Sequence, residues 1–275
     1  LFMSNQFSEN GFIIVRNAFS KKTVAEVQRA VIDSIYSKKK VVAGTQDKFL
    51  LFSRAVNKLK ISEYNFVKPI FKYLFYKGLL EKILLEKKLF NSLKNLLGED
   101  LSFAHDVSLT LNLKKKTSNE ENYLFKDWHQ EIWSGASISS VQTWTPLFQK
   151  NRHEGQIELI PKSHRWGHIP HKNRVPVELP KNYKIEKLNI KYGDVILFST
   201  LLVHRTMKTR FPRLALALLL KNFKYKNSSF EENRNWKIFS FSELTKVERY
   251  LGNHHLSPFR LLDIDNEINS GTLGK

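Results

Sequence analysis

Apolar residues near the start of the chain follow a strand-like spacing and then a helical one. The β-branched run within residues 11–19 predicts a strand, and Ser20 is a suitable N-cap for a helix over residues 21–36. In that helix, apolar side chains recur at steps of three and four residues, which predicts a single buried face. The chain is therefore expected to begin with a strand followed by an amphipathic helix.

Helical spacing returns over residues 62–97. Breaks at Gly78 and at the Leu97–Gly98 step predict two or three helices in this region. Their lysine-rich outer face is typical of a solvated helix packed on a sheet, and also of a helix lying on an anionic membrane. Residues 40–60 show no clear period, and we interpret them, together with the connection after Lys114, as candidate lids.

Beyond residue 100 the pattern changes to short runs that are rich in β-branched and aromatic residues. The runs cover residues 107–113, 137–144, 156–160, 185–190, 195–199 and 213–220. Short strands at such intervals, with no helical pattern between them, favour an antiparallel sandwich or barrel over βαβ units. A polar connection over residues 227–235 and one more helix over residues 242–251 follow.

Composition limits the class of protein. The chain has 275 residues, of which 41% are hydrophobic, enough for a sizeable core in one large domain or two small ones. It has no cysteine, which excludes disulfides, thiolate nucleophiles and cysteine-ligated metal sites, so any metal must bind histidine or carboxylate side chains. The absence of cysteine fits a reducing compartment, and no apolar stretch is long enough to span a membrane. We therefore expect a cytoplasmic protein without a transmembrane segment.

The chain carries a strong positive charge. Its 45 lysine and arginine residues outnumber 26 acidic ones, which gives a net charge of +19. Such an excess attracts polyanions, including nucleic acid, anionic lipid and phosphorylated metabolites, without choosing among them. The lysines are scattered in short runs, which is typical of a solvated surface.

Two histidines and one carboxylate are candidates for a metal site. His129 and Glu131 are two positions apart, so on an extended strand they would point to the same side, and His204 ends an apolar run. Two histidines and one carboxylate leave open positions on six-coordinate Fe(II), as oxygenases require. Taken singly, these residues also fit a surface pair and a satisfied core histidine. Arg213, at the start of a strand, fits either a bound carboxylate or a salt bridge within the protein.

Five motifs follow one another from residue 128 onward. They are Trp-His-Gln-Glu at 128–131, Val-Gln-Thr-Trp-Thr-Pro-Leu at 141–147, Glu-Gly-Gln-Ile-Glu-Leu-Ile-Pro-Lys-Ser-His at 154–164, Gly-Asp-Val-Ile-Leu-Phe at 193–198, and Val-His-Arg-Thr at 203–206 with Arg213. In this combination they resemble the phytanoyl-CoA dioxygenase family of Fe(II)- and 2-oxoglutarate-dependent oxygenases. The resemblance extends in order over residues 8–221 and is strongest over residues 127–220.

The resemblance implies a mainly β fold with flanking α-helices, built on a cupin-like double-stranded β-helix, or jelly roll. We expect a single domain over residues 1–275. An N-terminal strand and helices at about 8–100 would pack on a jelly-roll core at about 101–221, and a helical extension would occupy about 222–275.

Matched position by position, the resemblance makes His129, Glu131 and His204 the iron ligands at the catalytic centre. The family normally has Asp where this chain has Glu131, and Gly where it has Lys162. Glutamate is one methylene longer and can still ligate iron. Halogenating relatives carry a small residue at the carboxylate position, so Glu131 indicates hydroxylation instead.

The same match assigns four residues to the cosubstrate 2-oxoglutarate. Arg213 would clamp its far carboxylate, Thr206 would assist, Trp144 would lie beside it, and Gln130 occupies the usual position between the first two ligands. The implied activity is a dioxygenase reaction that uses O₂, hydroxylates an unactivated C–H bond and releases succinate and CO₂. Because imidazole must be neutral to bind iron, we expect activity to fall as the pH drops through about 6.5.

The expected substrate is a small metabolite, and an anionic one is a candidate. Residues 162–172 are dense in basic and aromatic groups, and in this family the segment lies near the mouth of the site. It could engage a coenzyme A thioester, a nucleotide-linked sugar or another phosphorylated metabolite, or it could be a solvated loop. His164, His168 and His171 also raise the alternative of a second metal.

Two other classes of protein compete with the enzyme. One is a noncatalytic jelly-roll protein that binds a polyanion, and the other is a nucleic-acid-binding protein, which the net charge of +19 would suit. The full set of ligand candidates together with Arg213 disfavours the first. The sequence has no recognised nucleic-acid-binding motif, which disfavours the second.

Overall fold

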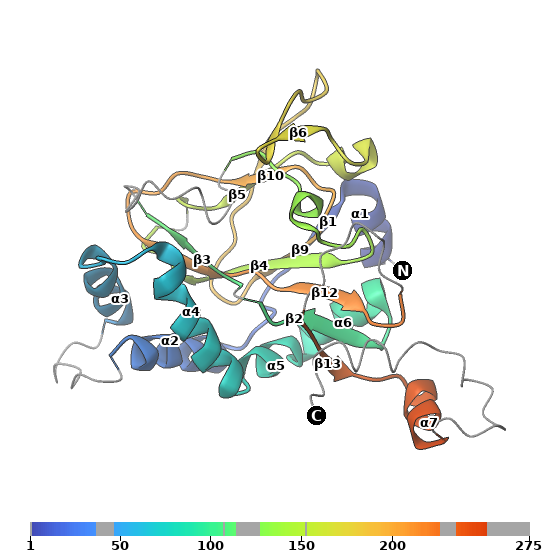
Figure 1. Cartoon of the computed structure of the whole chain (residues 1–275), viewed down its shortest axis with the longest axis horizontal. Coiled ribbons are helices and arrows are strands. Elements are labelled where there is room, and N and C mark those ends of the chain that lie inside the picture. Colours follow the sequence, from blue (N-terminus) through green and yellow to red (C-terminus); the bar gives the residue numbers. More distant parts are fainter. Residues whose placement is uncertain are drawn as a thin grey trace.

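Two antiparallel sheets form the centre of the fold, as the computed structural model in Figure 1 shows. The structure describes residues 2–36, 47–106, 108–113, 127–151, 153–225 and 235–251. The first part of the expected lid at 40–60, the connection that follows Lys114 and most of the polar connection at 227–235 lie outside the described residues.

The larger sheet has eight strands, and all of its pairings are antiparallel. Its main path runs through β1 (Phe12–Val15), β9 (Val195–Ser199), β4 (Val141–Phe148), β12 (Leu219–Asn222), β2 (Leu101–Ala104) and β13 (Trp236–Ser240). Two further strands, β11 (Arg213–Leu216) and β3 (Leu109–Asn112), join this sheet through β4.

A smaller sheet packs against the larger one. It consists of β10 (His204–Thr206), β5 (Ile157–Leu159) and β8 (Glu186–Lys187). Ile157 and Leu159 of this sheet share a buried cluster with Trp144, Ile196 and Phe198 of the larger sheet. A hairpin of β6 (His171–Lys172) and β7 (Val175–Pro176) projects at the top of Figure 1. Two packed antiparallel sheets of this kind are the arrangement of a jelly roll.

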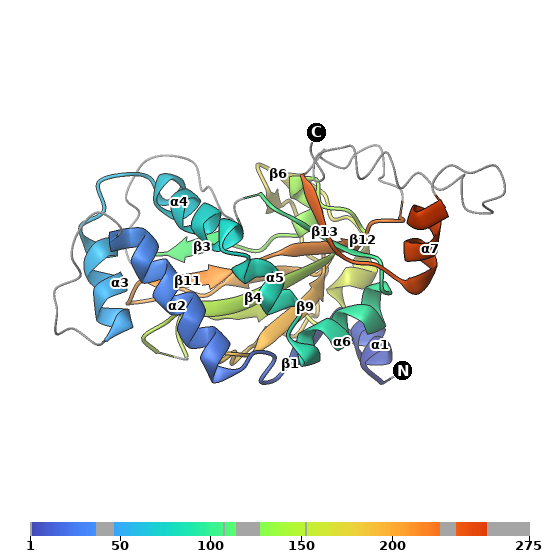
Figure 2. The ribbon, with the colours of Figure 1, turned by 90° about the horizontal axis from the view of Figure 1, so that it is seen from below.

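Helices cover the face of the larger sheet that points away from the smaller one (Figure 2). They are α2 (Lys21–Tyr36), α3 (Lys48–Asn57), α4 (Glu63–Tyr76), α5 (Leu79–Leu84) and α6 (Lys87–Leu97), while α1 (Phe2–Asn10) and α7 (Glu243–Leu251) lie at one end of the molecule. One buried apolar cluster joins the helices to the sheet and includes Val31, Leu74, Leu93 and Leu197. Within the described ranges, no helix is long and apolar enough to cross a membrane.

The predicted helices are confirmed, and two further helices, α1 and α3, were not expected. The helix α2 has the predicted bounds, and the Ser20 hydroxyl accepts a hydrogen bond from the Thr23 N–H at 3.1 Å, as an N-cap does. Residues 62–97 form three helices, α4 to α6. Of the two unexpected helices, α3 buries only Leu51, Phe52 and Val56, which are too few to give a periodic signal within residues 40–60, and α1 precedes the strand with which the chain was expected to begin.

Strand bounds differ from the predicted ones where pairing between strands decides them. The predicted strand at 213–220 is divided into β11 and β12, because at Leu218 the side-chain hydroxyl of Thr143, in the neighbouring strand β4, interrupts the backbone pairing. This hydroxyl donates to the Leu218 carbonyl at 3.1 Å and accepts from the Leu218 N–H at 3.0 Å. Pairing with neighbours also shortens the predicted strand at 185–190 to the two residues of β8.

Strands from both ends of the described chain belong to the larger sheet. The strand β1 pairs with β9, from Phe12 opposite Phe198 to Val15 opposite Val195, and β13 pairs with β2. The segment after residue 222 was expected to be helical, but it contributes β13 to the sheet before α7 begins. That both ends share one sheet is consistent with the single domain, which stays a prediction.

Candidate functional site

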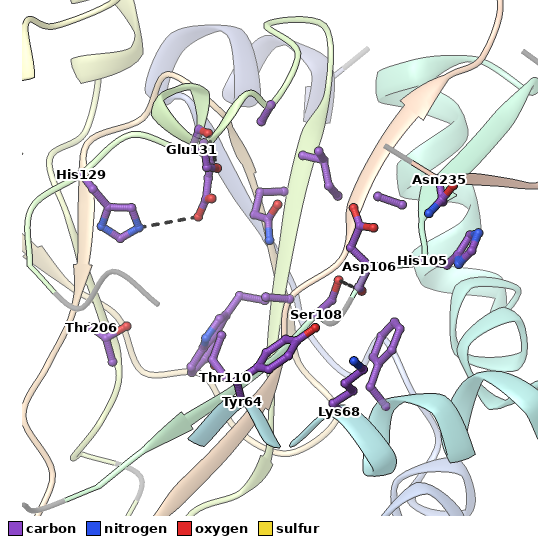
Figure 3. A pocket seen from close by; sticks show the side chains of 18 of the residues that line it. Tyr64, Lys68, His105, Asp106, Ser108, Thr110, His129, Glu131, Thr206 and Asn235 are labelled. Atoms are coloured by element: carbon purple, nitrogen blue, oxygen red, sulfur yellow. Dashed lines mark hydrogen bonds and ion pairs between the residues drawn. The ribbon is translucent and has the colours of Figure 1, made fainter. Parts of the chain in front are cut away.

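Three side chains converge beside the small sheet. Glu131 begins the short 3₁₀ helix η1 (Glu131–Ser134), His129 lies just before it, and His204 begins β10. Glu131 Oε1 lies 3.2 Å from His204 Nε2 and 3.7 Å from His129 Nε2, and Figure 3 shows the imidazole of His129 turned toward Glu131. One potential ligand atom from each residue lies within 4.8 Å of the others. These are the residues that the sequence predicted as iron ligands, and together they could hold a metal ion.

The backbone holds the two histidines side by side. The His129 N–H donates to the His204 carbonyl at 3.0 Å, and the His204 N–H donates back at 3.1 Å. The Nδ1 atom of His129 lies 2.6 Å from the Asp127 carbonyl, and that of His204 lies 2.9 Å from the Leu202 carbonyl. Because a carbonyl only accepts, each Nδ1 carries the proton and each Nε2 is left as the ligand atom.

Burial and neighbouring groups control the protonation of these residues. Burial and the proximity of His204 lower the pKa of His129, so its neutral form is favoured. Burial alone would raise the pKa of Glu131, but the interactions of its carboxylate with the imidazoles of His129 and His204 outweigh this effect and hold the pKa well below its usual range. A neutral imidazole and an ionised carboxylate are the forms that bind a metal.

Arg213 is a buried cation with unused hydrogen-bond donors. It begins β11, only 2% of its surface is exposed, and its Nε and Nη1 atoms have no hydrogen-bond partner within the described part of the chain. Burial lowers its pKa to about 9, which leaves the guanidinium charged at neutral pH. A buried cation with unused donors requires an anion, and a carboxylate matches the two parallel donors of a guanidinium.

Of the other residues predicted for the cosubstrate, Trp144 lies near Arg213, and Thr206 shares a cavity with Trp144. The ring centre of Trp144, in β4, lies 5.0 Å from the guanidinium carbon, and Trp144 lines the same cavity as Thr206 of β10. Gly155 approaches Arg213 closely, since a Cβ added there would lie 3.0 Å from Arg213 Cδ, and its φ of 64° also favours glycine. The side chains of Trp144 and Thr206 therefore surround space next to the candidate metal ligands.

Gln130 supports the backbone around the candidate metal ligands. Its side chain is buried, and its Nε2 donates to the Gly167 carbonyl at 2.8 Å and to the Leu201 carbonyl at 2.6 Å. Its Oε1 accepts from the Ile169 N–H at 2.9 Å. The expected cofactor role of Gln130 stays a prediction, and these bonds already use both amide donors. Gln130 therefore ties the segment that carries His129 to two neighbouring loops.

A cavity of about 800 Å³ extends from the three candidate ligands (Figure 3). Trp144, Ile157 and Phe198 form an apolar wall near the ligands. The cavity continues to the segment between β2 and β3, which contributes Asp106 and Ser108, and to helix α4. Its volume is within the range of sites that enclose a small organic molecule.

The wall formed by α4 was not identified from the sequence. Tyr64, Lys68, Lys72 and Tyr76 are four residues apart and all line the cavity. The spacing puts them on one face of the helix, which was the only available signal. A lysine-rich helix face is usually solvated, so only the packing of α4 reveals that this face looks toward the candidate ligands.

The segment 162–172 does not line the cavity, although it was expected near the mouth of the site; Arg174, just beyond it, does. His164 Nε2 lies 3.1 Å from the Ser8 carbonyl, and the ring of His171 packs on Trp133 at 4.7 Å between centres. Within the described residues, the only group of three potential ligands close enough to hold a metal is the one containing Glu131, so the second metal is not supported.

Lys162 departs from the family pattern at a position with an unusual backbone conformation. Its φ of 68° and ψ of −3° lie in the left-handed region that favours glycine, which explains why the family normally has Gly there. Its ammonium group lies 3.1 Å from Glu9 Oε1 of helix α1. The departure affects a turn outside the cavity, so it leaves the candidate site unchanged.

Comparison with known proteins agrees with this architecture. ThoJ, a non-heme monooxygenase in its apo form, has a TM-score of 0.57 at 14% identity, over 88% of this chain and 84% of that chain. EctD from S. alaskensis with 2-oxoglutarate and 5-hydroxyectoine has a TM-score of 0.54 at 19% identity, over 95% and 82%. The epimerase SnoN, in complex with Fe³⁺, alpha-ketoglutarate and nogalamycin RO, has a TM-score of 0.51 at 12% identity, over 81% and 83%. At these identities the likeness establishes a shared fold.

The match to a family model goes further. No curated protein matches the chain. Residues 7–215, well over half of the sequence, match the model of the phytanoyl-CoA dioxygenase (PhyH) family. The jelly-roll fold and the two-histidine, one-carboxylate cluster are the features that this match leads one to expect. The chain belongs to the phytanoyl-CoA dioxygenase family and is an Fe(II)- and 2-oxoglutarate-dependent oxygenase.

Proposed function

We propose that this enzyme hydroxylates an unactivated C–H bond of a small, anionic metabolite and releases succinate and CO₂. The observation that carries the proposal is the convergence of His129, Glu131 and His204 in one cavity, together with the buried guanidinium of Arg213 against Trp144 of the cavity wall. The three candidate ligands would bind a metal ion and the guanidinium would bind an anion within one site.

Iron fits the first feature. Two imidazole nitrogens and one carboxylate oxygen approach a common point, and such a set leaves positions open for other ligands. The Nδ1 bonds of His129 and His204 to backbone carbonyls fix both rings and both tautomers. His129, Glu131 and His204 would therefore hold Fe(II) with little rearrangement of their side chains.

The cosubstrate 2-oxoglutarate fits the second feature. Arg213 offers its Nε and Nη1 donors to a carboxylate, and a paired carboxylate would compensate for the cost of burying the guanidinium. Thr206 and Trp144, which line the neighbouring wall, would orient the same molecule. In this proposal Gln130 acts through the backbone alone.

Bound together, Fe(II), 2-oxoglutarate and O₂ supply the oxidant for C–H cleavage. The protein contributes position and environment. Trp144 and Phe198 are buried beside the ligands and keep water away from that end of the cavity. Glu131 fills the third ligand position with a carboxylate, which favours hydroxylation over halogenation.

The substrate is a small molecule, and the cavity volume of about 800 Å³ agrees with this class. Similar structures hold small organic molecules, 5-hydroxyectoine in EctD and nogalamycin RO in SnoN. For this chain we propose an anionic metabolite, such as a coenzyme A thioester, a nucleotide-linked sugar or another phosphorylated compound. The positive charge of +19 supports that choice.

Anaerobic titration of the full chain with Fe(II) and 2-oxoglutarate tests the proposed function. We expect a weak visible charge-transfer band, followed by succinate release when O₂ is admitted. His204→Ala should weaken iron binding at least about a hundredfold and abolish both signals, since it removes a ligand. The matched control is His168→Ala, an exposed histidine that does not line the cavity, and it should behave as wild type.

Other results would favour a competing class of protein. Absence of both the band and succinate in the wild type would favour a noncatalytic jelly-roll protein. Micromolar binding to random DNA with a steep dependence on salt would then favour the nucleic-acid-binding alternative.

A further inference from the structure

Helix α4 presents a stripe of four side chains to the cavity, at positions that the proposed iron and 2-oxoglutarate sites do not use. Tyr64, Lys68, Lys72 and Tyr76 recur every fourth residue and line the cavity, with Phe71 and Phe75 beside them. In Figure 3, Tyr64 and Lys68 project from the helix across the cavity from His129. The stripe therefore faces the part of a substrate that is remote from the metal.

The two lysines of the stripe have no acidic partner among the described residues. In the part of the chain that the structure describes, the Lys68 ammonium contacts the ring of Tyr64, whose centre lies 5.4 Å away. Like charges four residues apart on a helix disfavour it, and their Cβ atoms are about 6 Å apart. Lys68 is half-buried and Lys72 is exposed at the rim, so the pair runs from solvent into the cavity.

The charges on the cavity wall favour an anion at this end. Lys68, Lys72 and Arg174 are the cations among the described lining residues, and Asp106 and Glu131 are the carboxylates. Glu131 faces the two histidines and is assigned to the metal, which leaves Asp106 as the carboxylate opposite the lysines. Lys68 and Lys72 therefore supply the positive charge at the end of the cavity that is remote from the metal ligands.

The aromatic side chains define the neighbouring part of the ligand. Phe71, Phe75 and Tyr76 flank the lysines on α4, and the ring of Phe75 stacks on His105 at 5.1 Å between centres. Ring faces and edges of this kind accept an apolar or aromatic group. A ligand that matches the stripe carries a flat or apolar body next to its anionic group.

We infer that Lys68 and Lys72 bind the anionic end group of the substrate and that the aromatic side chains of α4 hold the body next to it. The inference rests on the proposed function and deepens it, because it names the recognition element and the polarity of the bound molecule. The carbon to be oxidised lies toward His129, and a phosphate or carboxylate lies at α4. Lys68 and Lys72 then determine specificity without taking part in the chemistry.

Calorimetric titration of the full chain, loaded with Fe(II) and 2-oxoglutarate without O₂, tests this inference. The probes are phenyl phosphate, phenylacetate and the neutral benzyl alcohol, all at one ionic strength. We expect at least one anion to bind with a stoichiometry of one, and benzyl alcohol to bind at least about tenfold more weakly. The preferred anion identifies the end group as phosphate or carboxylate.

Paired variants locate the binding. In Lys68→Ala/Lys72→Ala the anion should bind at least about tenfold more weakly, and Lys68→Gln/Lys72→Gln should do the same with less change in side-chain volume. The matched control is Lys77→Ala, because the Lys77 ammonium lies 5.5 Å from the Tyr73 ring on the same helix but does not line the cavity. That control should bind the anion within about twofold of wild type. Circular dichroism establishes that each variant is folded.

Two results would overturn the inference. One is the absence of saturable binding of both anions to the wild type, and the other is unchanged anion binding in the folded double variants. Either result, obtained with a protein that still forms the charge-transfer band, refutes the role of α4 and leaves the proposed function intact. Loss of the band in the wild type refutes the proposed function instead.

Discussion

Burial sets the charge states of the residues around the candidate metal centre. His129 is pushed toward its neutral form by burial and by His204, while Arg213 stays charged although burial lowers its pKa to about 9. The site is thus prepared for a cation at the histidines and for an anion at the arginine. Each of these two features leads to a measurable expectation.

Metal binding should survive moderate acid. A proton competes with the metal for His129 only when the pH approaches the pKa of this residue, and burial places that pKa below 6.5. We therefore expect the acid midpoint of Co(II) or Fe(II) affinity below pH 6.5, lower than the sequence alone predicted. Equilibrium dialysis across pH 4–8 measures it, with circular dichroism to exclude unfolding. A midpoint at or above 6.5 would contradict the effect of burial.

Arg213 should matter for cosubstrate binding more than for stability. Arg213→Lys replaces paired donors with one ammonium group, so we expect the KM for 2-oxoglutarate, measured by succinate release, to rise at least about tenfold. Arg213→Met removes a buried charge with unused donors, so its Tm without 2-oxoglutarate should equal or exceed that of wild type. A large fall in Tm for Arg213→Met would indicate a structural role for the guanidinium.

At the scale of elements, the ligands are held by short segments that depend on one another. His129 has only the bridge to His204 as regular backbone pairing, and η1 starts two residues later. Gln130 connects this segment to the loops at Gly167 and Leu201. The precision of the site therefore comes from contacts between loops and not from one continuous strand.

Removing the Gln130 amide should loosen the segment that carries His129. Gln130→Ala leaves a buried N–H at Ile169 and partly buried carbonyls at Gly167 and Leu201 without this partner, so we expect a loss of about 2–4 kcal/mol in the free energy of unfolding. Metal affinity should fall about 10-fold to 100-fold, as for other supports of a ligand. Urea unfolding and metal titration measure the two effects.

The control for this variant is Gln28→Ala. The Gln28 amide makes one hydrogen bond, to the Leu147 carbonyl at 2.8 Å, so its removal should cost about 1 kcal/mol and leave metal affinity unchanged. Equal effects of the two substitutions on metal affinity would show that Gln130 has no special role.

Sequence patterns predicted the elements that carry strong local signals. The amphipathic helix α2 and the apolar strand β9 were predicted at the bounds observed. Strands such as β10, which is three residues long and polar in all of them, are defined by their partners in the sheet and have no local signature. Tertiary contacts also explain why the cavity wall formed by α4 was missed. The four-residue spacing of its side chains is visible in the sequence, but the surface that this helix face packs toward is not.

The candidate metal ligands were identified from the resemblance to a family, because residue spacing alone did not identify them. His129 and His204 are far apart in sequence, and no local pattern indicates that they lie together. The family motifs assigned both to one site, and the structure brings the two residues together. The expected cofactor role of Gln130 stays a prediction, and its motif position did not reveal where its side chain points. Its hydrogen bonds to three backbone groups became visible only in the fold.

At the scale of the whole molecule, helices and sheets share one interior. The main apolar cluster runs from Ile13 of β1 through Leu74 of α4 to Leu220 of β12, so neither layer buries its apolar face without the other. Strands β1 and β13, from the two ends of the described chain, also lie at the two ends of the main strand order in the larger sheet. These contacts argue for a single cooperative unit.

Unfolding should therefore occur in one transition. The five tryptophans all lie outside helices α1 to α7, so their fluorescence reports on the β layer, whereas circular dichroism at 222 nm reports mainly on the helices. We expect the two urea transitions to coincide in midpoint and slope. Loss of the helical signal at lower urea concentration would divide the chain into two units and contradict the single domain.

The backbone bridge between His129 and His204 joins segments that are 75 positions apart (204 minus 129), in a protein that has no cysteine. An ion held by both imidazoles would reinforce this junction as a reversible crosslink. Because such an ion binds the native state and not the unfolded chain, resistance to unfolding rises with the concentration of free metal. The abundance of the protein in a cell, and not only its turnover, would then follow the supply of iron.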